Sequence, residues 1–160
     1  MRWDLIESFE VLKKGSYSRA RKSFSGTEDF FRDHFPGKPL VPETLMIEMI
    51  AQAGGVLLGV GINFEKEVIL AKIGQARFYR TVRPPCQLLV EATIEAEREE
   101  GAWISGTVKL ENELVAEAGA FLVTIDFLDN GDRKKIVFNE DFLKHYDILN
   151  VVRMSEEQSF

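Results

Sequence analysis

Residues 34–55, HFPGKPLVPETLMIEMIAQAGG, join one of the two histidines of the chain to a long apolar run. Pro42 suits the first turn of a helix, and the glycines farther along indicate that this helix ends near Leu58. Apolar residues cover all sides of the helix, which predicts that the rest of the domain encloses it. Glu48 is the exception, because it places an ionisable group near the middle of an otherwise apolar helix.

The composition is that of one globular domain with an acidic surface. The chain has 160 residues and a net charge of −6, which disfavours nucleic acid as a partner. The one cysteine cannot form an internal disulfide, and the N-terminus does not resemble a cleavable signal, so we expect a cytoplasmic protein. The longest uncharged apolar stretch, residues 49–64, is shorter than a membrane span, so membrane insertion is not expected.

The remaining pattern predicts about six strands around the helix. Residues 4–12 and 16–24 indicate a hairpin, and Gly74 interrupts the next extended run as a bulge or bend would. A meander of further strands follows the helix, at 67–80, 87–97, 102–110 and 114–127. An antiparallel sheet wrapped around one helix is the simplest α+β arrangement of these elements. We assign residues 1–127 to this domain and 128–160 to a C-terminal extension, in which Asn139 is predicted to cap a helix over 140–152.

Glu48, Gln52 and His34 are the candidates for chemistry. A buried carboxyl favours its protonated form, so Glu48 could act as a general acid or as a structural hydrogen-bond donor. Gln52 lies one turn farther on the same helix face, where its amide can orient the carboxyl. His34 precedes a turn, where a histidine is more often structural, but the prolines after it would fix the imidazole relative to the helix start. The set offers a base, an acid and backbone N–H groups able to polarise a carbonyl.

Residues 34–55 resemble the signature of the 3-hydroxyacyl-[acyl-carrier-protein] dehydratases, in the branch with a glutamate on the central helix. The stretch IGQARFYRTVRPPCQLLVEA, residues 73–92, is similar to a second strand motif of the same family. The likeness extends over residues 5–127. It implies a hot-dog fold, in which a curved antiparallel sheet wraps around a long central helix, and homodimers or higher assemblies of dimers whose sheets join.

The resemblance also implies a mechanism. His34 would abstract the C2 proton of a 3-hydroxyacyl thioester, and Glu48 of the other subunit would protonate the departing hydroxyl. Gln52 would hold Glu48, while Gly37 and the backbone N–H of Glu43 would support the site and bind the thioester carbonyl. The resemblance further implies that the reaction needs no metal or redox cofactor. It also implies that the substrate arrives on the phosphopantetheine arm of acyl carrier protein.

The acyl carrier protein is acidic, so the resemblance makes Arg77, Arg80 and Arg83 candidates for its docking. Glu43 departs from the family pattern, since a glycine usually follows the proline at the helix start. That departure keeps open a second reading, in which the chain binds acyl carrier protein or an acyl chain without turnover. A hot-dog acyl thioesterase is the third reading, although the set of His34, Glu48 and Gln52 favours dehydration.

Overall fold

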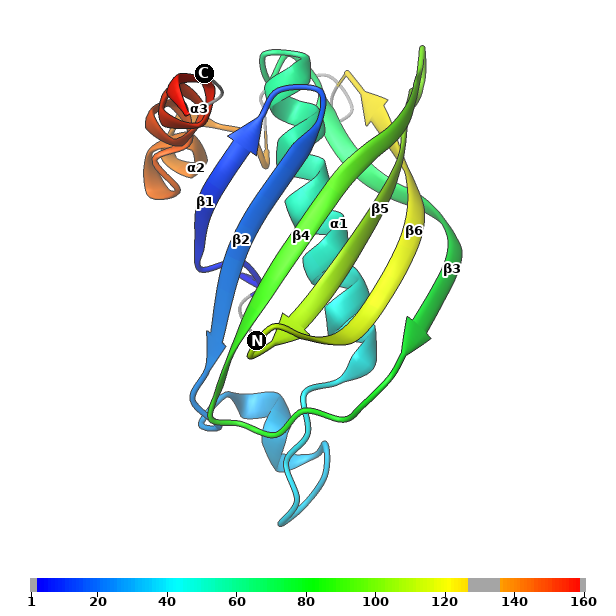
Figure 1. Ribbon diagram of the computed structural model, residues 1–160, viewed down its shortest axis with the longest axis vertical. Helices are drawn as coiled ribbons and strands as arrows, with labels where there is room; N and C mark the ends of the chain where they lie inside the picture. The colour runs from blue at the N-terminus through cyan, green and yellow to red at the C-terminus, as the bar shows by residue number, and fades with distance from the viewer. Residues whose placement is uncertain (1–2, 127–135, 159–160) are drawn as a thin grey trace.

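The computed structural model describes residues 3–126 and 136–158, in which six strands curve around one long helix (Figure 1). This arrangement confirms the predicted α+β class. The elements in chain order are β1 Ser8–Lys13, β2 Tyr17–Phe24, the short 3₁₀ helix η1 Asp29–Arg32, α1 Glu43–Gly61, β3 Glu67–Phe78, β4 Cys86–Arg98, β5 Gly101–Leu110, β6 Glu113–Ile125, α2 Glu140–His145 and α3 Ile148–Glu157.

The sheet is antiparallel throughout, with the strand order β1-β2-β4-β5-β6-β3. The hairpin of β1 and β2 was predicted correctly, and so was the irregularity at Gly74, where the register of β3 against β6 shifts. The prediction of a meander was wrong for β3, which lies at the edge of the sheet beside β6. The reason is α1, whose 19 residues span about 28 Å and carry the chain across the sheet between β2 and β3.

Helix α1 begins one residue after Pro42, which occupies the N-cap, and continues past the predicted end at Leu58 to Gly61. It ends where Asn63 and Phe64 take positive φ angles of 52° and 54°. The backbone N–H of Phe64 then donates to the carbonyl of Gly59 at 2.8 Å. By length and composition α1 could cross a membrane, but 72% of its apolar window is buried inside the domain, as in the core helix of a globular protein.

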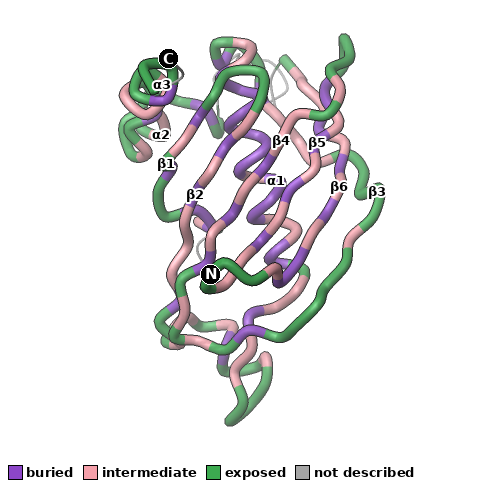
Figure 2. The backbone as a smooth tube through the Cα atoms, viewed as in Figure 1, coloured by how far each residue is buried: buried purple, intermediate pink, exposed green. Residues whose placement is uncertain are grey.

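Small residues let α1 approach the concave face of the sheet, and Figure 2 shows the buried residues gathered on these facing surfaces. A Cβ atom on Gly54 would lie 2.4 Å from Cδ1 of Ile104 in β5. Similarly, a Cβ atom on Gly106 would lie 2.4 Å from Cγ2 of Ile50 in α1. Each isoleucine therefore fills the space that a glycine on the facing element leaves empty, which fixes the position of α1 against the sheet.

The C-terminal extension forms two helices, α2 and α3, rather than the single predicted helix, and α3 packs on β1. Asn139 caps α2 as predicted, since its side chain accepts from the N–H of Phe142 at 2.9 Å. The helix breaks at Asp147, which has a left-handed backbone with a φ of 51°. The break allows α3 to bury Ser155, whose hydroxyl accepts from the N–H of Leu12 at 2.9 Å. The domain boundary predicted at residues 127 and 128 lies outside the described residues and stays a prediction.

Candidate active site

Glu48 lies in the second turn of α1, where the N-terminal segment crosses the helix. Unlike most of the helix, Glu48 and Gln52 are only half-buried, so the predicted enclosure of α1 on all sides is wrong at these positions. The ionisable group therefore sits where the fold permits contact with a ligand.

Glu48 is held by two N–H donors that reach the same carboxylate oxygen. The Gln52 amide donates to Oε1 at 3.0 Å, which matches the predicted orienting role of this residue. The indole N–H of Trp3 donates to Oε1 at 3.1 Å. Gln52 also binds the N-terminal segment, because its amide donates to the Trp3 carbonyl and its Oε1 accepts from the N–H of Leu5, both at 3.3 Å. The Trp3 and Gln52 donors both contact Oε1 of Glu48 and not Oε2. Oε2 is therefore available to a substrate.

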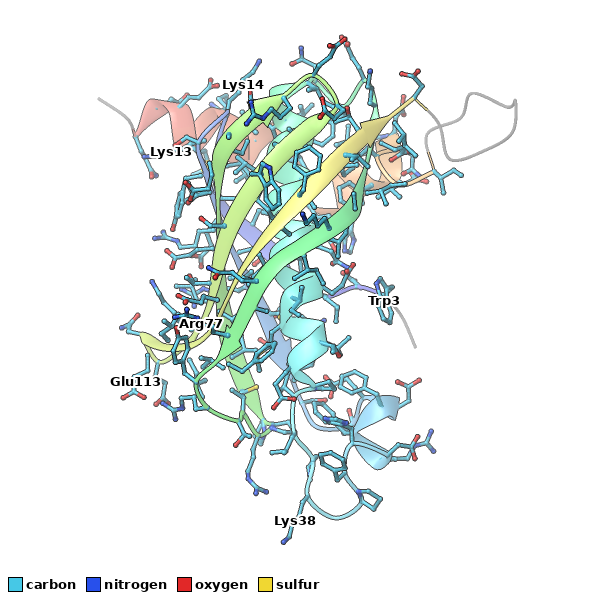
Figure 3. The ribbon with its side chains drawn as sticks, turned by 90° about the vertical axis from the view of Figure 1, so that its right-hand side faces the viewer. Trp3, Lys13, Lys14, Lys38, Arg77 and Glu113 are labelled. Atoms are coloured by element: carbon cyan, nitrogen blue, oxygen red, sulfur yellow. The ribbon has the colours of Figure 1, made fainter. Side chains whose placement is uncertain are left out.

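Trp3 was not identified from the sequence. Figure 3 shows it on the N-terminal segment beside α1. No periodic pattern links it to Glu48, since the two residues are 45 positions apart and meet only because the N-terminal segment crosses the helix.

An apolar cavity of about 360 Å³ adjoins Glu48. Glu48 and Gln52 supply its polar groups on α1, and Trp3 lies beside them. Its other lining residues are mostly apolar and come from the N-terminal segment, α1, β1, β3, β6 and the C-terminal extension: Ile6, Phe9, Ala51, Gly55, Val56, Val68, Leu70, Leu122, Val137, Phe138, Phe142 and Tyr146. An apolar cleft with a few convergent polar groups is the usual form of a small-molecule site.

His34 lies on the loop that leads from η1 to α1. Backbone hydrogen bonds hold it at both sides, from its N–H to the carbonyl of Phe30 at 3.1 Å and from the N–H of Leu40 to its carbonyl at 3.0 Å. Its imidazole stacks on the ring of Phe35, with the centroids 4.2 Å apart. Among the described residues, those lining the Glu48 cavity do not include His34. A single chain therefore does not bring the predicted base and acid into one pocket.

The loop around His34 has the turn that its sequence predicts. Pro36 and Gly37 occupy the middle of a turn closed by a 2.9 Å hydrogen bond from the N–H of Lys38 to the carbonyl of Phe35. Gly37 has a φ of 71°, and a Cβ atom there would meet nothing within 4 Å, so its backbone angle alone explains the glycine. Lys38 marks the exposed tip of this loop in Figure 3. Gly37 thus shapes the loop that carries His34.

Glu43 is the first residue of α1, where the first-turn N–H groups have no partner within the helix. Its carboxylate lies at the positive end of the helix dipole, which stabilises a negative charge. The same N–H groups are the ones that the resemblance assigns to the thioester carbonyl.

Arg77 lies near the end of β3, and Arg80 and Arg83 lie in the segment that leads from β3 to β4. Arg77 and Arg83 are exposed, whereas Arg80 forms an ion pair with Glu113. Figure 3 places Arg77 and Glu113 at the same end of the sheet. The ion pair offsets one of the three charges, so Arg77 and Arg83 remain the stronger docking candidates.

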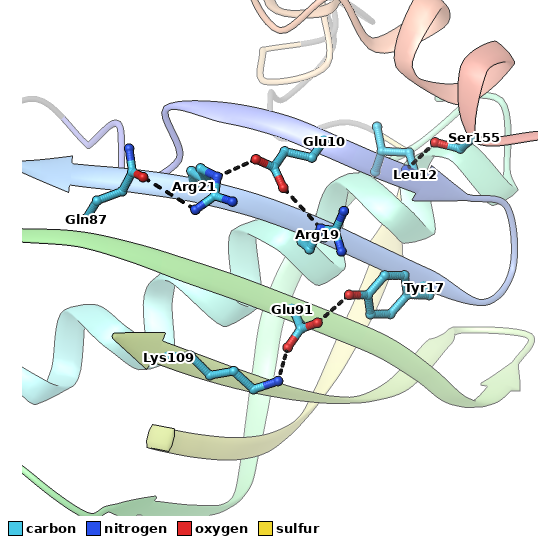
Figure 4. A network of polar contacts seen from close by, with 9 residues as sticks. All are labelled: Glu10, Leu12, Tyr17, Arg19, Arg21, Gln87, Glu91, Lys109 and Ser155. Carbon is cyan, nitrogen blue, oxygen red and sulfur yellow. Dashed lines mark hydrogen bonds and ion pairs between the residues drawn. The ribbon is translucent and has the colours of Figure 1, made fainter. Parts of the chain in front are cut away.

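A second polar group of residues lies on the outer face of the sheet (Figure 4). Glu91 accepts hydrogen bonds from Tyr17 and from Thr107, and it forms a 2.6 Å ion pair with Lys109. Burial raises the pKa of Glu91, but the hydrogen bonds from Lys109 and Tyr17 outweigh it and lower the pKa overall. Burial and the bond to Glu91 raise the pKa of Tyr17 to about 12. These groups satisfy one another, so we interpret them as cross-strand stabilisation.

Two further observations bear on other kinds of chemistry. Within the described ranges 3–126 and 136–158, no cluster of histidine, cysteine, aspartate and glutamate has the arrangement of a metal site. Burial raises the pKa of the Cys86 thiol, which makes it a poor nucleophile at neutral pH.

Comparison with known proteins identifies the family. The FabA-like domain family matches residues 4–119, which is more than half of the chain. The chain belongs to the FabA-like domain family. The 3-hydroxyacyl-[acyl-carrier-protein] dehydratase FabZ of Pectobacterium atrosepticum is 38% identical over 117 residues, which cover 71% of this chain and 78% of that protein. The FabZ dehydratase of Hydrogenobaculum sp. is 37% identical over 117 residues, which cover 71% of this chain and 79% of that protein.

Solved structures agree with this placement. A conserved protein of Pseudomonas aeruginosa superposes with a TM-score of 0.61 at 12% identity, covering 74% of this chain and 87% of that one. This FabA-like domain therefore has the hot-dog fold, and the predicted resemblance is confirmed. Helices α2 and α3 lie beyond the matched residues 4–119.

Proposed function

We propose that this FabA-like domain dehydrates 3-hydroxyacyl thioesters on acyl carrier protein to trans-2-enoyl thioesters, in fatty acid or related acyl-chain synthesis. The relatives named FabZ support the reaction. The observation that carries the proposal is Glu48, held by Gln52 and Trp3 at the polar end of an apolar cavity. Such a cavity can take an acyl chain while the carboxyl group reaches the carbon that bears the hydroxyl.

In the proposed reaction His34 and Glu48 transfer protons in opposite directions. The His34 imidazole takes the proton from C2, and the electron pair of that C–H bond forms the C2–C3 double bond. The C3–O bond breaks as the carboxyl group of Glu48 gives its proton to the hydroxyl, which leaves as water. The proton then passes from His34 back to Glu48 to reset the site. N–H groups at the start of α1, including that of Glu43, stabilise the negative charge that develops on the thioester oxygen.

We further propose that two copies of the chain complete each site, with His34 from one and Glu48 from the other. The separation of His34 from the Glu48 cavity within one chain supports this proposal. Strand β3 also supports it, because it is a 12-residue edge strand with exposed apolar side chains, Ile73 at 46% and Phe78 at 42%. An unpaired edge of this length can pair with the same strand of a second copy.

Acyl carrier protein is the proposed partner, with Arg77 and Arg83 as the main docking contacts and Arg80 in support. Proton transfer alone accomplishes the reaction, so no metal or redox cofactor is part of the proposal. The phosphopantetheine arm belongs to the substrate.

Product analysis with purified protein and 3-hydroxyacyl carrier protein tests the function. We expect the enoyl thioester from the native chain and none above background from Glu48→Gln, a variant that keeps the shape of the side chain. Free fatty acid would instead indicate a thioesterase. Binding of the carrier protein without any product would indicate the binding module. Glu43→Gly, which restores the glycine of the family pattern, would then be the first variant to test.

A further inference from the structure

The C-terminal extension, residues 136–158, forms one wall of the cavity that begins at Glu48. Phe138, Phe142 and Tyr146 line the cavity and recur every four residues along the extension. Their rings touch in sequence, with centroids 5.4 Å apart for Phe138 and Phe142 and 5.0 Å apart for Phe142 and Tyr146. Phe64 continues the row at one end and Phe9 at the other, at 5.0 Å and 5.6 Å. The wall is therefore a continuous row of aromatic rings.

The Phe138 end of the wall lies well beyond Glu48 along the axis of α1. The cavity follows one face of α1 through Glu48, Gln52, Gly55 and Val56. Phe138 lies beside Gly59, since a Cβ atom on that glycine would be 3.2 Å from the ring of Phe138. Eleven residues of α-helix separate Glu48 from Gly59, which corresponds to about 16 Å along the helix axis.

The extension is held in place by specific contacts. Glu67 in β3 is fully buried, and its carboxylate accepts from the backbone N–H groups of Ile136, Val137 and Phe138 at 2.6, 3.0 and 3.3 Å. Charge-assisted bonds of this kind are about twice as strong as neutral ones. The hydroxyl of Tyr146 binds the carboxylate of Asp4 and lies 3.0 Å from the carbonyl of Ile6. The wall is thus fixed at both ends of the aromatic row.

We propose that this aromatic wall limits the length of the acyl chain, stopping it about three helical turns beyond Glu48. The inference rests on the proposed function, because it assumes that the acyl chain of the substrate occupies the cavity. Short and medium chains fit in front of Phe138 and Phe142, and longer chains meet the rings. Phe138 and Phe142 lie outside the family match at 4–119, in the C-terminal extension.

The test compares turnover over a series of 3-hydroxyacyl carrier proteins of increasing chain length. The native chain should lose activity beyond a limiting length. Phe142→Ala should move that limit to longer chains, with a gain of about fourfold in kcat/KM for each methylene group newly accommodated. Leu149→Ala is the matched control, because Leu149 is 73% exposed on α3 and does not line the cavity.

Glu67→Gln provides a second variant in which every lining residue is unchanged. It removes the charge that binds the three N–H groups, so hydrogen exchange at residues 136–138 should become faster and the length limit should move in the same direction. Identical chain-length profiles for the native chain, Phe142→Ala and Glu67→Gln would contradict the proposal that the wall limits acyl-chain length.

A binding measurement separates failure of the wall from failure of the proposed function. Saturated acyl-pantetheine thioesters lack the hydroxyl and cannot be dehydrated, and the fluorescence of Trp3 can report their binding in a Trp103→Phe background. The affinity of the native chain should stop rising at the limiting length, whereas that of Phe142→Ala should continue to rise. If no substrate yields an enoyl product, the dehydratase proposal fails. The binding series alone then tests whether the aromatic wall limits acyl-chain length. An affinity that is independent of length in both proteins would refute it.

Discussion

The indole N–H of Trp3 donates a 3.1 Å hydrogen bond to Oε1 of Glu48, the same oxygen that the Gln52 amide contacts. Trp3 is 60% exposed, so this bond joins a surface residue to the proposed catalytic acid. Two donors on one oxygen fix the rotation of the carboxyl group and direct the other oxygen to the substrate.

Trp3→Phe should therefore slow catalysis without unfolding the domain. The substitution keeps an aromatic ring and removes the N–H, so the loss corresponds to one hydrogen bond of about 1 kcal/mol, or about fivefold in rate. We expect the change in kcat rather than in KM, since the bond orients Glu48 and does not bind the acyl chain. Trp103→Phe, on the outer face of the sheet, is the control and should leave kcat unchanged. Equal effects of the two variants would contradict the positioning role of Trp3.

The charge of Glu43 should reduce activity. Its carboxylate lies at the start of α1, where negative charge develops on the thioester oxygen in the proposed reaction. We expect Glu43→Gln to raise kcat/KM by about two- to fivefold, the rate equivalent of 0.3–1 kcal/mol at a helix terminus. The same substitution should slightly lower thermal stability, because a carboxylate favours this end of the helix dipole. Lower activity in this variant would show that the carboxylate assists the reaction.

The adjacent residues Gly54 and Gly55 should respond oppositely to alanine. At Gly54 the new methyl group would lie 2.4 Å from Ile104, and overpacking of this kind lowers the free energy of unfolding by about 1–3 kcal/mol. At Gly55 the nearest atom would be 3.8 Å away from the new methyl group. The higher helix propensity of alanine should therefore raise the free energy of unfolding by about 0.5–1 kcal/mol. Urea denaturation measures both. A loss at both positions would mean that α1 packs differently against the sheet.

Tyr17 should make the domain less stable in alkali. Its pKa is raised to about 12 from 10.0 by burial and by the hydrogen bond to Glu91, so the folded chain retains a proton that the unfolded chain loses. Stability is therefore fully present below about pH 10 and falls as the pH rises from 10 to 12. Glu91→Gln should lower the pKa of Tyr17 and weaken this dependence, which ultraviolet titration of tyrosine can follow with Tyr17→Phe as the blank. An unchanged titration would contradict the coupling of the two residues.

The sequence predicted features that depend on local spacing and not those that depend on how distant segments meet. The four-residue spacing of Glu48 and Gln52 placed them on one helix face, and Asn139 signalled its cap through the neighbouring residues. The position of β3 could not be derived, since strand order depends on non-local pairing.

Glu67 shows the same limit at the level of one residue. In the sequence it is a charged residue among others at the start of a strand, and it becomes a fully buried carboxylate only when the N–H groups of residues 136–138 surround it. Trp3 likewise acquires a role only through the path of the N-terminal segment across α1. The family resemblance supplied the pairing of His34 with Glu48, for which a single chain provides no shared pocket.

Complementation between two inactive variants tests the central claim most directly, namely that His34 of one chain and Glu48 of another carry out the dehydration. His34→Ala and Glu48→Gln should each yield no enoyl product alone. When equal amounts are unfolded and refolded together, half of the dimers are mixed and each mixed dimer has one intact site, so activity should return to about a quarter of the native value. Activity that stays at background, although the native protein treated in the same way recovers, would contradict a site shared between chains.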